Sequence, residues 1–201
     1  QGYSSAASDV YKRQALGLLY IATTVWGYSI AFPMKEYIHL AEWCCISGLL
    51  GGTFYLFAFI YEFVTKKRLN AIFYLNTAVV LSLILIATII MQLNVDEAFV
   101  FIHIVNPILI LIYFFVFCDC SENKKILSVI TCITFPIFYI LFALCVWQSS
   151  GQCPFPASLI LVWDNVLIPI GIIFGLCALI IGLSFGFFYL NRLIRKLISK
   201  K

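Results

Sequence analysis

Six long apolar segments dominate this sequence, and each is close to the length that a helix needs to cross a lipid bilayer. They run from Ala15 to Met34, Glu42 to Phe63, Ala71 to Met91, Phe99 to Phe117, Ile126 to Trp147 and Val166 to Leu190. A spanning helix needs about 20 mostly apolar residues. Backbone groups in hydrocarbon must be satisfied within the segment, and these runs lack the strict alternation of barrel strands. All six segments are therefore predicted to be helices.

The composition excludes a soluble globular protein. Of the 201 residues, 63% are hydrophobic and 11% are charged, whereas a soluble domain carries about 25% charged residues. So little charge could not cover a water-exposed surface, but a bilayer solvates apolar faces directly. The expected class is an all-α integral membrane protein, and not a soluble enzyme, a coiled coil or a disordered chain.

Lys and Arg fall almost entirely on one side of the six predicted spans. Of the 13 Lys and Arg residues, only Lys35 lies in a loop on the other side. Because cytoplasmic loops collect Lys and Arg, the sequence predicts a six-helix transmembrane bundle with both termini cytoplasmic. The cations stand at the ends of apolar runs, so the expected partners are membrane lipids and not nucleic acid.

The first 14 residues differ from everything that follows. They read QGYSSAASDVYKRQ, and the run SSAASDVYKRQ looks like translated sequencing-adapter read-through. Such a segment is left out of fold reasoning. The chain is therefore interpreted as a non-native segment, residues 1–14, followed by one six-helix transmembrane domain, residues 15–201.

Polar residues within the predicted helices gather near the external face, where His103 and Asn106 share one face of a helix three positions apart. A neutral imidazole there could act as a general base, because its unperturbed pKa of about 6.5 lies near neutral pH. The alternative is a histidine that packs between helices through a hydrogen bond.

Several motifs in the second half of the chain resemble one known family. They are FIHIVNPILILIYFFVFCDC, ITFPIFYILFAL, a CPFP loop and the final NRLIRK. The chain resembles the androgen-induced and androgen-dependent six-helix membrane proteins and their uncharacterised bacterial relatives, over most of residues 35–201. This resemblance implies a multi-pass protein of a bacterial cytoplasmic membrane.

The resemblance also implies a chemistry. Characterised animal members are threonine-dependent hydrolases that cleave esters between fatty acids and hydroxy fatty acids, with a histidine partner that His103 matches. The family threonine falls at Cys44, and Gly48 stands where the family has asparagine. A Cys44 and His103 pair could transfer an acyl group through a thioester, with Asn106 steadying the imidazole or the oxyanion. The substrate would be an acyl lipid.

A non-catalytic role remains the alternative, because the family threonine is missing and Cys44 could simply pack between helices. The protein would then be a small-molecule carrier or a lipid-binding or partner-binding scaffold. No cofactor or metal site is predicted, since His39, Glu42, His103 and Asp164 suit interfacial solvation better than zinc.

Three further expectations concern contacts at helix ends and between helices. Glu62 and Lys66 are expected to form a solvated ion pair at a helix end. Asp164 and Asn165 are expected to cap the last helix. Two sets of glycines are expected to allow close helix approach, namely Gly48, Gly51 and Gly52, and Gly171, Gly175, Gly182 and Gly186.

Overall fold

The computed structural model describes residues 2–31, 37–91, 97–121 and 125–198, without the side chains of residues 2–10, 31, 97, 98, 125 and 128. Within these ranges every regular element is a helix, as predicted. The long helices are α1 (Gly2–Ala31), α2 (Trp43–Thr65), α3 (Ala71–Ile90), α5 (Asn106–Phe117), α6 (Lys125–Ser150) and α8 (Leu167–Ile198). The shorter ones are the 3-10 helix η1 (Tyr37–Ala41), α4 (Glu97–Val100), the π-helix η2 (Phe101–Val105) and α7 (Ala157–Leu161).

Four helices are long and apolar enough to cross a membrane. They are α2, α3, the Val129–Ser150 part of α6, and α8. The η2–α5 segment, Phe101–Phe117, is a shorter apolar helix. As far as the structure describes its residues, helix α1 is not among the four. The length and apolar character of the four helices indicate a membrane protein of the all-α class.

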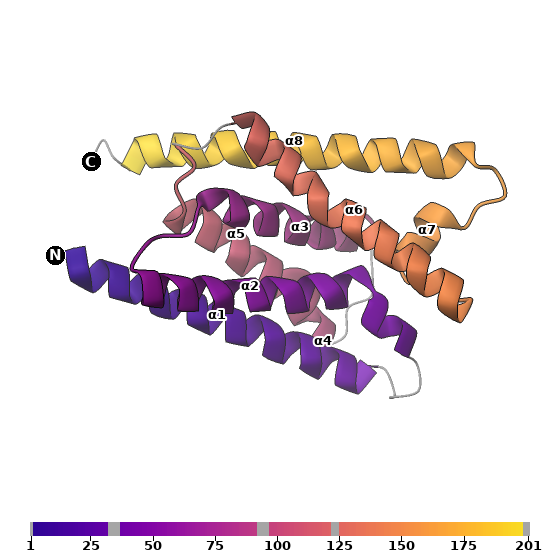
Figure 1. Cartoon of the computed structure of the whole chain (residues 1–201), viewed down its shortest axis with the longest axis horizontal. Helices are drawn as coiled ribbons and strands as arrows, with labels where there is room; N and C mark the ends of the chain where they lie inside the picture. The colour runs from indigo at the N-terminus through magenta and orange to yellow at the C-terminus, as the bar shows by residue number, and fades with distance from the viewer. Residues whose placement is uncertain (1, 32–36, 92–96, 122–124, 199–201) are drawn as a thin grey trace.

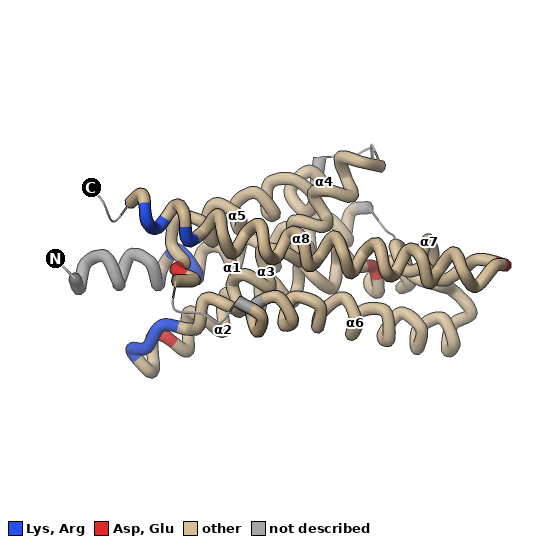
Figure 2. Tube along the Cα trace, turned by 90° about the horizontal axis from the view of Figure 1, so that it is seen from above, with Lys and Arg blue, Asp and Glu red and all other residues tan. Residues whose placement is uncertain are grey.

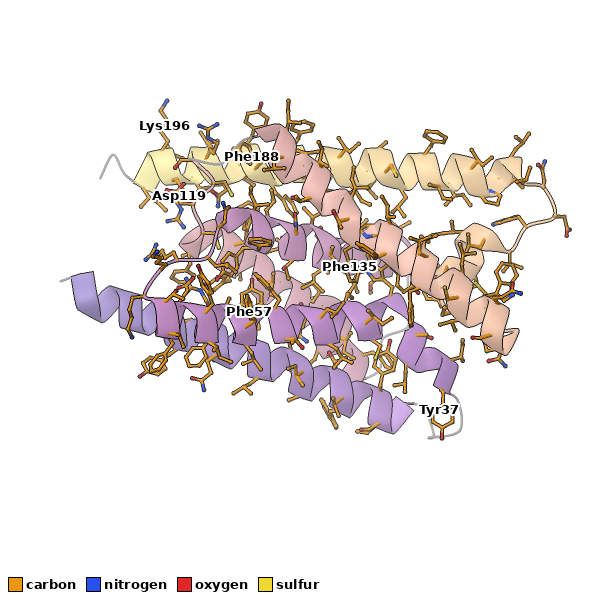
Figure 3. All side chains as sticks on the ribbon, in the orientation of Figure 1. Tyr37, Phe57, Asp119, Phe135, Phe188 and Lys196 are labelled. Atoms are coloured by element: carbon orange, nitrogen blue, oxygen red, sulfur yellow. The ribbon has the colours of Figure 1, made fainter. Side chains whose placement is uncertain are left out.

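Both chain termini lie at the same end of the molecule (Figure 1). The Lys and Arg residues that the structure describes gather at this end (Figure 2), which we call the basic end. The opposite end, which we call the distal end, carries η1 and α7. Among the labelled side chains, Asp119 and Lys196 lie toward the basic end and Tyr37 lies at the distal end (Figure 3).

Helices α1 and α2 approach each other closely because glycines line their interface. A Cβ atom at Gly52 would lie 3.0 Å from the carbonyl oxygen of Gly17, and one at Gly48 would lie 2.5 Å from Oγ1 of Thr24. Small residues allow such backbone contact between membrane helices, so this expectation is confirmed for α2.

The same expectation is wrong for α8. No described atom lies within 4 Å of a Cβ atom placed at any of its glycines, which are Gly171, Gly175, Gly182 and Gly186. The glycine-bearing face of α8 is therefore open in this chain, and most of the helix is exposed. At its start, Oδ1 of Asn165 accepts a hydrogen bond from the Leu167 amide at 3.0 Å, as expected for a residue that caps the helix.

Side chains of α8 hold the end of α5 in place. Nδ2 of Asn191 donates to the carbonyl oxygens of Phe114 and Cys118 at 3.1 and 3.0 Å, and its Oδ1 accepts from the amide of Cys120 at 3.0 Å. Nε of Arg195 also donates to the Cys118 carbonyl, at 2.8 Å. The last carbonyls of a helix have no partner within it, so α8 supplies the donors that end α5.

Glu62 lies inside the bundle near the basic end. Arg13 donates to the carboxylate of Glu62 and to the hydroxyl of Tyr113, and the Arg13 and Glu62 side chains are both more than nine-tenths buried. Oε1 of Glu62 also accepts from the Leu69 amide at 3.0 Å and from the Tyr74 hydroxyl at 3.4 Å. Burying a carboxylate is costly unless it is paired and hydrogen-bonded, and these groups meet both conditions.

The expected solvated pair of Glu62 with Lys66 is therefore wrong. Lys66 is exposed, and its Nζ lies 4.6 Å from the centre of the Phe63 ring. Lys66 follows the last residue of α2 and has a left-handed backbone conformation, with φ of 56°. Its side chain therefore leaves the helix face on which Glu62 lies, which the spacing in the sequence did not reveal. The structure also places Arg13, from the segment interpreted as non-native, in helix α1.

Replacing Arg13 by Gln tests the buried pair. We expect the free energy of unfolding in detergent to fall by about 3 kcal/mol, because removal of one partner leaves an uncompensated buried charge. The exposed Lys67→Gln variant is the charge-matched control and should unfold like the unmodified protein. Equal stability of all three proteins would contradict the pairing and would agree with a first segment that is foreign to the fold.

Candidate functional site

The three residues predicted to carry chemistry come from neighbouring elements. Cys44 lies in the first turn of α2, His103 lies in η2, and Asn106 is the first residue of α5. Helix α2 contacts η2, and all three side chains are buried, with exposed fractions of 9%, 8% and 0%. No hydrogen bond joins Cys44 to His103 among the described residues. The structure therefore brings their helices together without forming the nucleophile–base hydrogen bond itself.

An unusual backbone turn positions His103. The amide of Asn106 donates to the carbonyl oxygen of Phe101, five residues earlier, which is the hydrogen bond of a π-helix. Pro107 follows directly and cannot donate the next backbone hydrogen bond. Single π-turns within helices occur frequently at functional sites. This feature sets the segment around His103 apart from the regular helices of the bundle.

The hydrogen bond of the His103 ring defines which nitrogen can act as a base. Nδ1 lies 3.0 Å from the carbonyl oxygen of Phe99, and a carbonyl oxygen only accepts. In the neutral ring, Nδ1 therefore carries the proton and Nε2 has the free lone pair. The Phe99 ring packs against the imidazole, with 5.4 Å between ring centres. His103 is thus held in one tautomer with Nε2 as the basic nitrogen.

The amide of Asn106 is oriented by Thr23 of α1. Nδ2 donates to Oγ1 of Thr23 at 2.7 Å, while the Thr23 hydroxyl donates to the carbonyl oxygen of Leu19, also at 2.7 Å. Oδ1 of Asn106 is fully buried and has no partner within the described part of the protein. Asn106 therefore presents an acceptor to the interior. An acceptor can hold a protonated imidazole but not an oxyanion, which favours the first of the two roles expected from the sequence.

Glu42 is the residue at this site that the sequence reasoning undervalued. It directly precedes α2 and forms no side-chain cap with the helix. Instead, Oε1 lies 2.6 Å from Nδ1 of His39, and Oε2 accepts from the hydroxyl of Tyr28 at 3.0 Å. Tyr28 belongs to α1 and is 5% exposed. Glu42 therefore links α1, η1 and the start of α2.

The carboxylate of Glu42 also connects the predicted catalytic residues. It lies within electrostatic range of Cys44, of His103 and of Tyr139 of α6. A carboxylate in this place favours a positive charge on the His103 ring and opposes a negative charge on the Cys44 sulfur. We call the set of His39, Glu42, Tyr28, Cys44 and His103 the Glu42 cluster. The sequence had already drawn attention to His39, Glu42, Cys44 and His103. It gave no sign that Tyr28, on another helix, contacts Glu42.

An aromatic layer joins the start of α2 to α6. The Trp43 ring makes edge contacts with Phe135 and Tyr139, with ring centres 5.0 and 4.8 Å apart. Phe135, labelled in Figure 3, lies between α6 and α2. The carbonyl oxygen of Phe155 accepts from the Tyr139 hydroxyl at 2.8 Å and from the Trp43 amide at 3.2 Å. These contacts hold the first turn of α2, which carries Cys44, against α6.

The cluster does not form a recognisable metal centre. Among the described residues, no group of three or more His, Cys, Asp and Glu side chains is placed to hold a metal ion. The pair of His39 and Glu42 supplies only two ligands, whereas a zinc site needs at least three from the protein. The arrangement is better suited to moving a proton than to binding a cation.

Comparisons with known proteins add no assignment. No family model, no curated protein and no solved structure matches this chain. The resemblance to the androgen-induced proteins therefore stays a prediction that rests on its short motifs.

Replacing Glu42 by Gln tests whether this carboxylate organises the cluster. We expect the free energy of unfolding to fall by about 2 kcal/mol, because hydrogen bonds to a charged acceptor are stronger than those to an amide. The measurement is thermal or denaturant unfolding in detergent, with the exposed Asp164→Asn variant as the control. A Glu42→Gln variant as stable as the control would show that the contacts of Glu42 contribute little.

Proposed function

We propose that this chain is a multi-pass membrane hydrolase or acyl transferase that acts on an acyl-lipid ester at its distal end. The observation that carries the proposal is the Glu42 cluster, in which one carboxylate is hydrogen-bonded to His39 and Tyr28 at the start of α2, next to the buried thiol of Cys44. His103 lies on η2, which contacts α2, and is held in a defined tautomer. Ionisable residues within membrane helices are candidates for a functional site. The resemblance to the androgen-induced proteins supplies the substrate class.

The proposed reaction begins at Cys44. Its Sγ attacks the ester carbonyl carbon while Nε2 of His103 takes the thiol proton, and Nδ1–H stays bonded to the Phe99 carbonyl. Glu42 and Oδ1 of Asn106 stabilise the positive charge that forms on the imidazole. The imidazolium then gives its proton to the departing alkoxide, which leaves as an alcohol, and the acyl group remains on sulfur as a thioester. Water completes hydrolysis, or a second alcohol completes transfer, when its oxygen attacks the thioester carbonyl carbon and His103 takes its proton. The C–S bond then breaks, and His103 returns the proton to the Cys44 sulfur.

The proposed topology has six spans and both termini in the cytoplasm of a bacterial cell. Four helices are apolar and long enough to span, and α1 and the α4–η2–α5 segment run alongside them (Figure 1). The shared position of the termini and the gathering of cations at the basic end support this orientation, because cytoplasmic loops are enriched in Lys and Arg. The Glu42 cluster would then face the outer leaflet.

Reporter fusions test the topology. A cytoplasm-active reporter such as green fluorescent protein should be fluorescent when fused to either terminus, and a periplasm-active phosphatase should be active when inserted after Gly151 in the α6–α7 loop. Gly151 is suited to insertion because it is exposed and lies in a turn with positive φ. Termini that report from opposite sides would overturn the six-span arrangement and the depth assigned to the cluster.

Matched cysteine variants test the chemistry. Purified protein in detergent should hydrolyse a long-chain p-nitrophenyl ester, Cys44→Ala should abolish this activity, and His103→Ala should lower it by at least about 10²-fold, the usual contribution of a general base. Cys45→Ala is the control, because Cys45 is the adjacent buried cysteine and has no role in the mechanism. Unchanged hydrolysis in Cys44→Ala would refute the assignment.

A non-catalytic scaffold is the second candidate, and one observation favours it. Cys44 is nine-tenths buried, and it forms no hydrogen bond with His103 among the described residues. An acyl-directed probe separates the two functions. Labelling of Cys44 that depends on His103 supports the enzyme, and absence of labelling in folded protein supports the scaffold.

A further inference from the structure

The motif NRLIRK near the end of α8 takes no part in the proposed reaction. It covers residues 191–196. Asn191 and Arg195 donate hydrogen bonds to carbonyl oxygens at the end of α5. Arg192 and Lys196 are one helical turn apart, and both are exposed. The motif therefore fixes α5 with one part of its surface and presents cations with another.

A cavity of about 700 Å³ opens beside these cations. It lies between the last turns of α8 and the chain that follows α5, and two of its lining residues, Asp119 and Lys196, are labelled in Figure 3. The volume falls within the range of small-molecule sites, roughly 300–1,000 Å³. The charged residues of the lining are Asp119, Arg192, Arg195 and Lys196.

Positive charge is in excess in this lining, where three cations meet one acidic residue, Asp119. Partial burial opposes ionisation of Asp119, but hydrogen bonds from Ser121 and the charges of Arg195 and Arg192 outweigh it and hold the pKa of Asp119 below its ordinary value. Even with this carboxylate ionised, the net charge of the lining is positive. An anionic group would be attracted to the cavity, whereas the ammonium of a zwitterionic headgroup would be repelled.

The guanidinium of Arg192 has hydrogen-bond donors to offer to an anion. Its Cζ lies 5.5 Å from the centre of the Phe188 ring, and the charge of Asp119 acts on it from a longer distance. Arg192 forms no hydrogen bond or ion pair with any residue that the structure describes. A ring face holds a guanidinium without using its N–H groups. These N–H groups match the oxygens of a phosphate, which a guanidinium can bind through two parallel hydrogen bonds.

Arg195 adds a second cation whose orientation is already fixed. Its Nε donates to the carbonyl oxygen of Cys118 at 2.8 Å, and its Nη2 donates to that of Val116. Carbonyl oxygens are uncharged acceptors, so these bonds hold the side chain without neutralising it. A group that is ordered before the ligand arrives loses little entropy on binding.

The cavity lies where lipid headgroups are expected. Helix α8 is long and apolar enough to cross a membrane, and these cations occupy its last turns at the basic end (Figure 2). Leu193 and Ile198 also line the cavity and are 53% and 54% exposed, so they offer an apolar border for acyl chains. Basic pockets at the ends of membrane helices bind anionic headgroups. We infer that this cavity binds the phosphate of an anionic phospholipid through Arg192 and Arg195.

Lipid retention on the full chain tests this inference. The protein is reconstituted in nanodiscs of equal parts phosphatidylglycerol and phosphatidylethanolamine, extracted into detergent and analysed by native mass spectrometry for lipids that stay bound. We expect selective retention of phosphatidylglycerol. Arg192→Gln should weaken this retention about tenfold, as expected for the loss of one charge-assisted hydrogen bond. Arg192 is exposed, so the substitution should not prevent folding, whereas replacing Arg195 would also disturb the end of α5.

A control variant and a soluble competitor complete the test. Lys67→Gln removes an exposed cation that does not line the cavity, and it should leave retention unchanged. Free glycerol phosphate should compete weakly, because it lacks acyl chains. The assignment would be overturned by equal retention of the two lipids, by an equal effect of Arg192→Gln and Lys67→Gln, or by competition from glycerol phosphate as strong as that from phosphatidylglycerol. The last result would show that the cavity takes a soluble phosphate instead.

Discussion

Hydrocarbon offers no hydrogen bonds, so every polar side chain inside this bundle must find its partner within the protein. Arg13 pairs with Glu62, Asn106 with Thr23, and Asn191 with the end of α5. Each of these interactions joins two different helices through residues at least 49 positions apart in the sequence. They restrict how the helices slide and rotate, which apolar packing alone specifies poorly. The arrangement of the bundle therefore depends on a few internal polar contacts.

The same constraint separates the molecule into two polar ends. At the distal end, Glu42 satisfies its two carboxylate oxygens with His39 and Tyr28 and holds the start of α2 against α1. At the basic end, the carboxylate oxygens of Glu62 accept hydrogen bonds from Arg13, from the Leu69 amide and from the Tyr74 hydroxyl. The two carboxylates lie at opposite ends of α2. Each end of this helix is therefore fixed to its neighbours by one buried or partly buried acidic residue.

Four buried polar groups are exceptions among the described residues. The hydroxyls of Tyr20 and Tyr55, the indole nitrogen of Trp43 and Oδ1 of Asn106 are buried there without a hydrogen-bond partner. Each such group costs roughly 1–3 kcal/mol. The Trp43 ring packs against α6, and the Tyr55 ring packs against Tyr74 and Tyr113 of α3 and α5. Aromatic packing therefore holds these groups where hydrogen bonding is incomplete.

Some features were predictable because they depend on local sequence. The helical class followed from the length of the apolar runs, and the gathering of cations at one end followed from their positions between these runs. The burial of Cys44, His103 and Asn106 was not obvious, since polar residues near a membrane face can also be solvated. The role of Glu42 was missed because Tyr28 approaches it from another helix, and Glu62 was misassigned because Lys66, one turn away, offered a simpler partner.

The sequence by itself determined that this chain forms apolar helices with a basic end, because hydrophobicity and charge act on each segment separately. Only the tertiary structure decided which polar groups meet, because that depends on how each helix is rotated about its axis. The glycines illustrate the difference, since those of α2 contact α1 and those of α8 contact no described residue. Their spacing alone gives no information about which helix face another helix will cover.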